Sequence, residues 1–409
     1  LPTRRQRQMC IRDRDISSND RSAMMPNYSF PDLVPEKALG SRLWDENGKE
    51  YIDFGGGIAV TSLGHCHPVL MKSMEEQSKK LWHVSNYLLS KPAKELGQKI
   101  ASKSFADKVL FSNSGNEANE AAIKLARKYF FEKGDEEKYE ILSFTNSFHG
   151  RSLANITLGD SEFHQTGFGP LPKGFIKAEF NNIEDVKKKI SNKTAAIIVE
   201  LIQGEAGVIS AQNDFVEALR NICNENNILL IFDEVQSGIG RTGTLFAYQG
   251  YGVIPDILTL AKGLGGGLPI AATITTTDIA KCMQPGTHGS TFGGNPVSCA
   301  VASKLIDIVD DKKLLSGVME KTIKFIDHLQ NLSKKYDFFS DIRSAGLWIA
   351  ADMKQATSKE FLSRSYEEGL LLVSANGERT LRFAPSLIIS DQEIEEGFSK
   401  LEKVTKSFC

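Results

Sequence analysis

Residues 228–234 read Ile228-Leu229-Leu230-Ile231-Phe232-Asp233-Glu234, five apolar residues followed directly by two acidic ones. An unbroken apolar run of this length is typical of a strand that is buried on both faces, as in a parallel sheet covered by helices. Open α/β sheets carry their functional groups at the carboxyl ends of such strands. The run therefore predicts a central strand with a polar group at its end, although a solvated strand boundary has the same pattern.

Similar apolar runs occur on both sides of this strand, and amphipathic segments lie between several of them. In residues 118–129, for example, the apolar side chains recur at helical spacing. Alternating strands and helices favour an α/β domain whose mostly parallel sheet is covered on both faces. The predicted strands are Val109–Phe111, Ile141–Phe144, Ala195–Val199, Ile228–Phe232, Ile257–Leu260 and Ile270–Ile274.

The two ends of the chain differ from this pattern. The C-terminal part predicts a smaller α+β domain, with a long helical stretch from 296 to about 335, short strands near 347–352, 370–373 and 380–383, and a final helix over 391–407. Residues 28–54 predict a short strand-rich segment. We expect an N-terminal segment over 24–70, a large domain over 71–300 and a small domain over 301–409. Residues 1–23 mix arginines with acidic residues and are expected to be disordered or artefactual.

Composition excludes several classes of function. The 409 residues are 41% hydrophobic and 24% charged, with a net charge of −2, so nucleic acid and anionic membranes are not expected partners. No apolar run approaches the ~18 residues of a membrane span, and we expect a cytoplasmic protein. The six cysteines form no C-x-x-C pair, which favours reduced thiols. His65-Cys66-His67 could suggest a metal, but Gly64 and Pro68 indicate a turn, and no metal is expected.

A possible anion site follows the first predicted strand. Ser114 and Glu117 have the spacing of a capping box, which places a helix N-terminus at Gly115 and Asn116. Free backbone N–H groups and the helix dipole at such a point bind anions, most often phosphate. The alternative is an ordinary capped helix.

A single lysine, Lys262, follows the apolar strand 257–260 and precedes a glycine-rich run. Burial would lower the pKa of its amine, and a neutral amine can attack an aldehyde. The alternative is an exposed lysine in a turn. Asp233 could hold a metal, a ribose or a protonated ring nitrogen. Together with the phosphate-type helix start, these groups suit a cofactor that has a phosphate, a pyridine nitrogen and an aldehyde, which is pyridoxal phosphate.

Further motifs run in order along the chain from about Tyr28 to the C-terminus. They include Gly40-Ser41-Arg42-Leu43-Trp44-Asp45, Asn113-Ser114-Gly115, Phe148-His149-Gly150-Arg151, Ile202-Gln203-Gly204-Glu205, Gly240-Arg241-Thr242-Gly243, Thr287-His288-Gly289-Ser290-Thr291 and Arg382-Phe383-Ala384-Pro385. With these motifs the sequence resembles the class III (ω-amino) aminotransferases, and among them most closely the acetylornithine aminotransferases. The resemblance implies the pyridoxal-phosphate-dependent fold type I, with a large domain around a mostly parallel sheet and a smaller α+β C-terminal domain.

The resemblance also implies roles for single residues. Lys262 would bind the cofactor covalently and move a proton at the substrate carbon, while Asp233 would pair with the pyridinium nitrogen. The other implied cofactor contacts are Ser114, Gly115 and Asn116 for the phosphate, Val235 and Phe148 for the two ring faces, Gln236 for the phenolic oxygen, and Thr291 of the partner subunit in an obligate homodimer. The implied substrate contacts are Arg151 for a carboxylate, the switch pair Glu205 and Arg382, Ser290 for the acylated substrate, and Tyr28 in the same pocket.

The activity that the resemblance implies is transfer of the δ-amino group of N2-acetyl-L-ornithine to 2-oxoglutarate, a step of arginine biosynthesis with ping-pong kinetics. Leu201 and Ala206 replace the usual Pro and Gly around the Gln-Gly-Glu motif, and Asn116 stands where Ala or Thr is usual. The alternative donors are therefore succinylornithine, succinyldiaminopimelate, ornithine and 4-aminobutyrate. An aminomutase and a cofactor-free binding protein of the same fold are the alternatives from other classes.

Overall fold

The computed structural model describes residues 24–375 and 377–409. The expectation for residues 1–23 lies outside the described residues. The chain divides into two units, residues 1–34 and 35–409. In the first unit, residues 24–34 form turns and bends without helix or strand. All elements below belong to the second unit.

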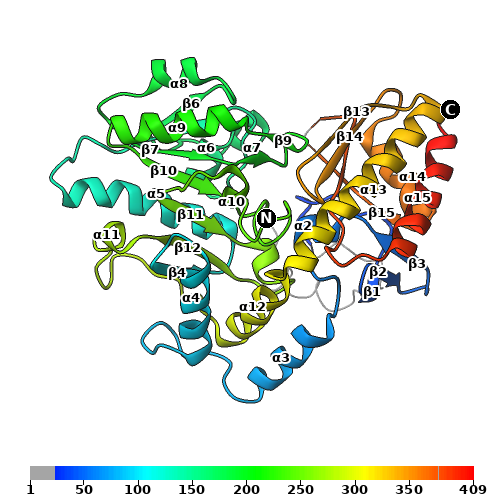
Figure 1. Cartoon of the computed structure of the whole chain (residues 1–409), viewed down its shortest axis with the longest axis horizontal. Coiled ribbons are helices and arrows are strands. Elements are labelled where there is room, and N and C mark those ends of the chain that lie inside the picture. The colour runs from blue at the N-terminus through cyan, green and yellow to red at the C-terminus, as the bar shows by residue number, and fades with distance from the viewer. Residues whose placement is uncertain (1–23, 376) are drawn as a thin grey trace, which may run out of the picture. The chain divides into compact units, whose positions relative to one another are not determined.

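The main sheet of the second unit has seven strands and lies among helices (Figure 1). In spatial order its strands are β4 (Lys108–Ser112), β12 (Ala271–Thr275), β11 (Ile257–Leu260), β10 (Leu229–Asp233), β7 (Thr194–Val199), β5 (Glu140–Phe144) and β6 (Phe175–Ala178). Neighbouring strands from β11 to β6 are parallel, whereas β12 runs antiparallel to β11 and β4. The predicted α/β fold with a mostly parallel sheet is therefore confirmed.

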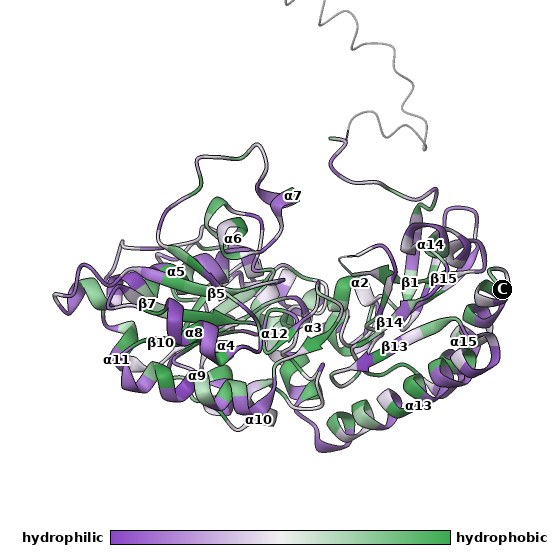
Figure 2. Cartoon of the chain, turned by 90° about the horizontal axis from the view of Figure 1, so that it is seen from above, coloured by the Kyte–Doolittle hydropathy of each residue, from purple (hydrophilic) through white to green (hydrophobic). Residues whose placement is uncertain are grey.

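Helices cover both faces of this sheet, which explains the apolar run in β10. Leu229 and Ile231 belong to the core cluster on the side of α5 (Gly115–Glu132). Leu230 and Phe232 belong to the cluster that includes the apolar face of α9 (Asn213–Glu225). Because successive side chains of a strand point to opposite faces, a strand between two cores carries apolar side chains on both faces. In Figure 2, α9 carries hydrophobic and hydrophilic residues along its length, as expected for a covering helix.

The C-terminal part contains a four-stranded antiparallel sheet and long helices. The sheet order is β13 (Phe339–Ser344), β14 (Ile349–Met353), β17 (Thr380–Phe383) and β16 (Val373–Ser374). The predicted helical stretch from 296 to about 335 is helical and consists of two helices, α12 (Pro296–Val309) and α13 (Lys312–Tyr336). The side chain of Asp311 accepts a hydrogen bond from Leu314 N (2.9 Å) and caps α13, so the chain breaks at Asp310 and Asp311.

The strands near the N-terminus share a sheet with a C-terminal strand. Its order is β1 (Pro35–Leu39), β2 (Arg42–Asp45), β3 (Glu50–Asp53) and β15 (Leu370–Leu371). The predicted strand at 370–373 is therefore divided, since β15 pairs with β3 and β16 pairs with β17. The remaining elements are α2 (Gly56–Ala59), α3 (Pro68–Ser78), α4 (Lys91–Lys103), α6 (Leu153–Leu158), α7 (Glu162–Gln165), α8 (Ile183–Lys189), β8 (Ile202–Gln203), β9 (Ile209–Ser210), α10 (Tyr248–Tyr251), the 3₁₀ turn Lys262–Leu264, α11 (Thr277–Ala280), α14 (Ser358–Glu367) and α15 (Asp391–Lys406).

None of the helices in the described part of the chain has the length and apolar character that a membrane crossing requires.

Candidate active site

Helix α5 begins where the sequence predicts, directly after Ser114. The Ser114 side chain accepts a hydrogen bond from Glu117 N (3.3 Å). The reciprocal bond differs from a standard capping box, because Glu117 Oε2 accepts from the backbone N–H of Asn113 (3.0 Å) instead of that of Ser114. The N–H groups of Gly115 and Asn116 lie in the first turn, where a helix offers no acceptor of its own. They are free to bind an anion.

Asp233 is buried at the carboxyl end of β10 and is held by several donors. Its Oδ2 accepts a hydrogen bond from Asn119 Nδ2 (2.7 Å) and lies 2.8 Å from His149 Nδ1. Its Oδ1 accepts from the backbone N–H of Val235 (3.0 Å). These contacts fix the orientation of the carboxylate at the end of the strand.

Lys262 follows β11 at the start of a 3₁₀ turn. Its backbone has a φ of +41°, in the left-handed region that non-glycine residues rarely adopt and that is often found at functional sites. The amine donates a hydrogen bond to Gln236 Oε1 (2.8 Å). Burial lowers the pKa of the amine to about 8, and the nearby Arg382 acts in the same direction, while Glu205 and Asp233 oppose it. The exposed-turn alternative is therefore wrong.

These groups meet in one pocket of about 420 Å³. The predicted site residues that line it are Ser114, Gly115, Asn116, Phe148, Arg151, Asp233, Val235, Gln236 and Lys262. They come from the start of α5, the segment after β5, the end of β10 and the end of β11. The carboxyl edge of the parallel sheet thus brings together residues that lie far apart in the sequence.

The segment between β5 and α6 carries Phe148 and Arg151. Phe148 N donates to Oε1 of the buried Glu200 (2.8 Å). Arg151 is exposed, and its guanidinium lies over the Phe148 ring at 5.5 Å. Burial, together with the Asp233 carboxylate, raises the pKa of Glu200 well above its usual range. The bond that it accepts from Phe148 N lets Glu200 hold this segment beside the end of β7.

The predicted switch pair is formed. Arg382 is buried, and its Nη1 donates to Glu205 Oε1 (2.9 Å), while its Nε donates to Ser374 O (2.9 Å). Both charges act on the Lys262 amine. The pair therefore lies close enough to the pocket to influence its chemistry.

Three further predicted residues are not among those that line the pocket of Lys262. Ser290 is bound to the start of α5, since its Oγ accepts from Asn113 Nδ2 (2.8 Å) and donates to Glu117 Oε1 (3.0 Å). Thr291 is exposed and lines a different pocket from Lys262. Tyr28 belongs to the first unit, where its exposed ring lies 5.9 Å from that of Phe30. The roles of these residues stay predictions.

Sequence reasoning missed several residues of the site. Asn119 and His149 bind Asp233, and Glu200 lines the pocket. His164 is a fourth, because its ring lies 6.1 Å from that of Phe148 and the charges of Arg151 and Glu205 act on it. Glu200 could have been found, since it follows the predicted strand at 195–199 exactly as Asp233 follows its own.

No group of three or more His, Cys, Asp or Glu side chains in residues 24–375 and 377–409 is arranged to hold a metal ion. At the His65-Cys66-His67 motif, His65 Nε2 lies 2.8 Å from Asp53 Oδ2.

Comparison with known proteins gives the family. The model of the family described as Aminotransferase class-III matches residues 23–405. This chain belongs to the class III aminotransferases. An acetylornithine/succinyldiaminopimelate aminotransferase of Buchnera aphidicola is 49% identical over 94% of this chain and 95% of that protein. An acetylornithine aminotransferase of Pseudomonas putida is 46% identical over 93% of this chain and 94% of that protein.

Solved structures of class III relatives have the same fold. The N-acetylornithine aminotransferase of Stenotrophomonas maltophilia matches with a TM-score of 0.81 and 35% identity, covering 92% of this chain and 96% of that one. The ornithine aminotransferase of Toxoplasma gondii matches with a TM-score of 0.90 and 32% identity, covering 100% of this chain and 96% of that one.

Class III aminotransferases use pyridoxal phosphate, and the pocket fits this cofactor. The first-turn N–H groups of α5 suit its phosphate. Gly115 leaves space that a side chain would fill, since a Cβ there would lie 2.5 Å from Val235 Cγ1. Asp233 suits a protonated ring nitrogen, and the Lys262 amine suits an aldehyde. All of these groups line the same pocket.

Proposed function

We propose that this enzyme transfers the δ-amino group of N2-acetyl-L-ornithine to 2-oxoglutarate, giving N-acetyl-L-glutamate 5-semialdehyde and L-glutamate. The proposal rests on the position of the Lys262 amine, which lines one pocket together with Asp233 and Arg151. The pKa of this amine is lowered, and the charges of the Glu205–Arg382 pair act on it. A single site with two alternative carboxylate anchors suits two substrates that bind in turn.

Each residue of the pocket has one task in this mechanism. Pyridoxal phosphate, when bound, supplies an aldehyde that links to amines and a ring that takes up electrons. Lys262 would hold the aldehyde and then take up and release the proton of the amine-bearing carbon. Asp233 would accept a hydrogen bond from the ring nitrogen, and Gln236 would contact the phenolic oxygen. Val235 and Phe148 would enclose the ring, and Ser114, Gly115 and Asn116 would bind the phosphate.

The substrate side has one permanent and one conditional anchor. Arg151 would bind a substrate carboxylate with its bidentate guanidinium. Arg382 would stay paired with Glu205 while the amine donor is bound. When the pair opens, Arg382 would take the α-carboxylate of glutamate. Ser290 would contact the acyl group.

The two departures around the Gln-Gly-Glu motif lie outside the pocket of Lys262. Leu201 is buried in the core, where its carbonyl oxygen accepts from the Tyr251 hydroxyl (3.1 Å). Ala206 lines a separate pocket of about 350 Å³. Neither residue therefore argues against an acylated donor. Because the Buchnera relative is also named for succinyldiaminopimelate, this larger acylated donor is the second candidate.

A donor panel tests the substrate. With 2-oxoglutarate as acceptor, we expect N2-acetylornithine to exceed ornithine and 4-aminobutyrate in kcat/KM by about 100-fold or more, because those donors lack partners for the site's polar groups. Succinyldiaminopimelate, which carries additional carboxylates on its acyl group and on its amine-bearing carbon, is expected to react more slowly than N2-acetylornithine but faster than the two donors without an acyl group. Glutamate formation, coupled to a dehydrogenase, measures each rate. A preference for free ornithine would refute the proposed donor, and absence of glutamate with every donor would refute the aminotransferase assignment.

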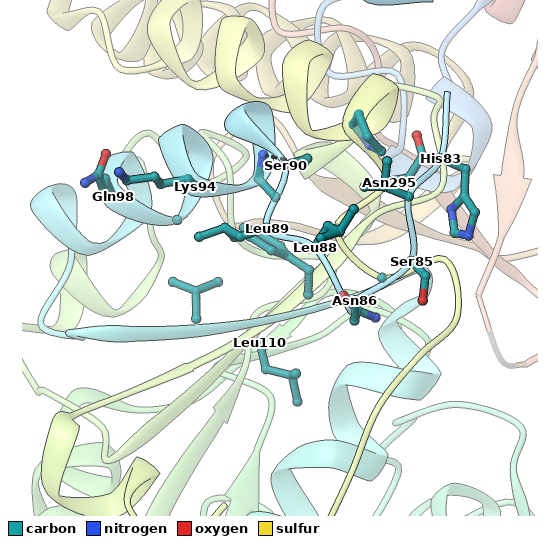
Figure 3. A pocket seen from close by; sticks show the side chains of 18 of the residues that line it. His83, Ser85, Asn86, Leu88, Leu89, Ser90, Lys94, Gln98, Leu110 and Asn295 are labelled. Atoms are coloured by element: carbon teal, nitrogen blue, oxygen red, sulfur yellow. Dashed lines mark hydrogen bonds between the residues drawn. The ribbon is translucent and has the colours of Figure 1, made fainter. Parts of the chain in front are cut away.

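We propose further that two copies form a homodimer in which Thr291 completes the phosphate site of the partner. Thr291 lines a pocket of about 530 Å³ whose side chains include Leu88, Leu89 and Leu110 (Figure 3). Leu89, which lines this pocket, is 76% exposed, and Tyr87, two residues before it, is 95% exposed. Exposed large apolar side chains close together in the sequence suit a protein interface. A second copy is the occupant that would bring Thr291 to another α5.

Mixed dimers test this arrangement. Lys262→Ala and Thr291→Glu should each inactivate the homodimer, the second by placing a negative charge at the phosphate. When the two variants are refolded together in equal amounts, half of the dimers are mixed and one of their two sites is intact, so about a quarter of the wild-type activity should return. If Thr291 serves the site of its own chain, mixing restores nothing. Size-exclusion chromatography with light scattering confirms the dimer in each sample.

A further inference from the structure

The segment from Phe148 to Ser152 has neither helix nor strand, yet its backbone is held by side chains from three elements. Phe148 N is bound by Glu200, which follows β7. The carbonyl oxygen of His149 accepts from Asn119 Nδ2 of α5 (2.8 Å), and the His149 ring contacts Asp233 of β10. The last two residues depend on a different side chain of α5.

That side chain is Asn116. Its Oδ1 accepts the backbone N–H groups of both Arg151 and Ser152, each at 2.7 Å. Asn155 Nδ2 donates to the same oxygen (3.0 Å) and to the Asn116 carbonyl oxygen (2.8 Å). One amide oxygen thus receives three hydrogen bonds.

The contact is also sterically close. Gly150 has a φ of +133°, and a Cβ at this position would lie 2.5 Å from Asn116 Oδ1. A side chain at position 150 would therefore collide with Asn116, so the close contact between the segment and Asn116 requires glycine. The backbone of Arg151 is held from α5, although the Arg151 guanidinium is exposed and is free to meet a ligand.

We propose that Asn116 is a positioning residue that sets where Arg151 meets the substrate carboxylate. The inference rests on the proposed role of Arg151. It separates two tasks of Asn116, because the backbone N–H serves the phosphate whereas the side chain serves Arg151. Asn116 thereby connects the phosphate end of α5 with the carboxylate anchor.

Two substitutions separate these tasks. Asn116→Ala keeps the backbone N–H and removes the acceptor of Arg151. Asn116→Asp keeps an acceptor oxygen and adds a negative charge beside the anion site. Ser152→Ala is the matched control: it removes the side-chain bonds of Ser152 to Glu120 and Asn155 but leaves its backbone N–H bound to Asn116.

The donors are N2-acetylornithine and N-acetyl-1,4-diaminobutane, which is the same molecule without the carboxylate. Asn116→Ala should lower kcat/KM for N2-acetylornithine roughly 10- to 100-fold, mainly through KM, because a displaced anchor misplaces its ligand. For the donor without a carboxylate, kcat/KM should change less than about twofold, since Arg151 has nothing to bind there. Ser152→Ala should leave the ratio of the two donors unchanged.

Affinity for pyridoxal phosphate, titrated on the apoprotein by absorbance, should be affected by Asn116→Asp and not by Asn116→Ala. Asn116→Ala should keep the wild-type Kd, whereas Asn116→Asp should raise it about tenfold or more through repulsion of the phosphate. Asn116→Asp should nevertheless keep the wild-type ratio of the two donors when it is saturated with cofactor. Equal losses for both donors in Asn116→Ala, or a changed ratio in Asn116→Asp, would overturn the proposal.

Binding of glutarate to the cofactor-loaded protein separates this inference from the proposed donor. Glutarate has two carboxylates and no amine. Its Kd therefore measures how well Arg151 binds a carboxylate, whichever amino donor the enzyme prefers. Asn116→Ala should raise this Kd about tenfold, toward the value of Arg151→Ala. If wild type and Asn116→Ala bind glutarate equally, Asn116 does not position the anchor. If wild type and Arg151→Ala bind it equally, Arg151 is no anchor and the inference fails with it.

Discussion

Replacing Lys262 with alanine should lower the aminotransferase turnover number by about 10⁴-fold or more, because a positioned proton-transfer group alone contributes up to about 10⁴. The side chain lies in the pocket of Asp233 and is the basic group there that can move a proton at the substrate carbon. Single-turnover formation of glutamate measures the loss. A small soluble amine such as ethylamine should restore part of the rate, since it supplies the missing base. A variant with more than a tenth of wild-type activity would contradict the role of Lys262.

The pKa of this amine gives a second measurement on the apoprotein. Burial lowers the pKa of Lys262 to about 8. Lowering the pKa of a lysine raises the neutral fraction at a given pH, so at pH 7.5 about a quarter of the amines are neutral, against about one in a thousand for an ordinary lysine. Competitive labelling with acetic anhydride, read by mass spectrometry, should therefore be half-maximal near pH 8. At lower pH the extent of labelling should decrease.

Lys177 is the matched control for this labelling. Burial lowers the pKa of its amine to about 8 as well, but it donates to Gly159 O (2.7 Å) and does not line the pocket of Lys262. Both lysines should show the same labelling midpoint, and pyridoxal phosphate should protect Lys262 alone. Protection of Lys177 would show that the effect is unspecific.

The sequence predicts the main sheet well because its strands lie between two cores. β10, β7 and β11 are buried at every position, so nearly all of their residues are apolar and the runs can be read directly, although Thr259 lies within β11. β6 is missed because Lys177 interrupts its short run and three of its four residues are only half-buried. At the edge of a sheet, one-sided burial leaves a weaker pattern.

Periodicity also fails where one helix follows another. The apolar spacing of α12 continues into α13, so it predicts a helical stretch without showing where the stretch is divided. The division lies at Asp311, whose side chain accepts a hydrogen bond from Leu314 N (2.9 Å) and caps the second helix. A capping aspartate has the same appearance in the sequence as an exposed helical one.

The site could be predicted only in part. Asp233 and Lys262 follow apolar strands, and Ser114 begins a helix, so each has a local pattern. Asn119 has none, because its function comes from its contact with Asp233, which lies 114 positions away. Contacts of this kind become visible only when the strands have been placed side by side.

Replacing Asp233 with asparagine should lower kcat/KM by about 10²- to 10³-fold, the cost of removing one partner of a buried charge pair when the other charge stays. Asparagine has nearly the same shape but no charge, so it would no longer stabilise a protonated ring nitrogen. It would also misfit locally. Both carboxylate oxygens accept bonds, from Asn119 Nδ2 and from Val235 N, so either orientation of the new amide sets an NH₂ group against a donor.

The neighbouring carboxyl, Glu234, separates the pocket effect from a loss of folding. Glu234 is equally buried but accepts from Ala247 N and Tyr248 N (2.6 Å each), outside the pocket. Glu234→Gln therefore introduces the same local misfit, an NH₂ group against a backbone N–H, without removing a group of the pocket. We expect this variant to unfold at a lower temperature than wild type, while kcat/KM of the folded enzyme falls far less than in Asp233→Asn. If Glu234→Gln loses as much activity as Asp233→Asn, the effect belongs to the strand end in general and the charge on Asp233 has no special role.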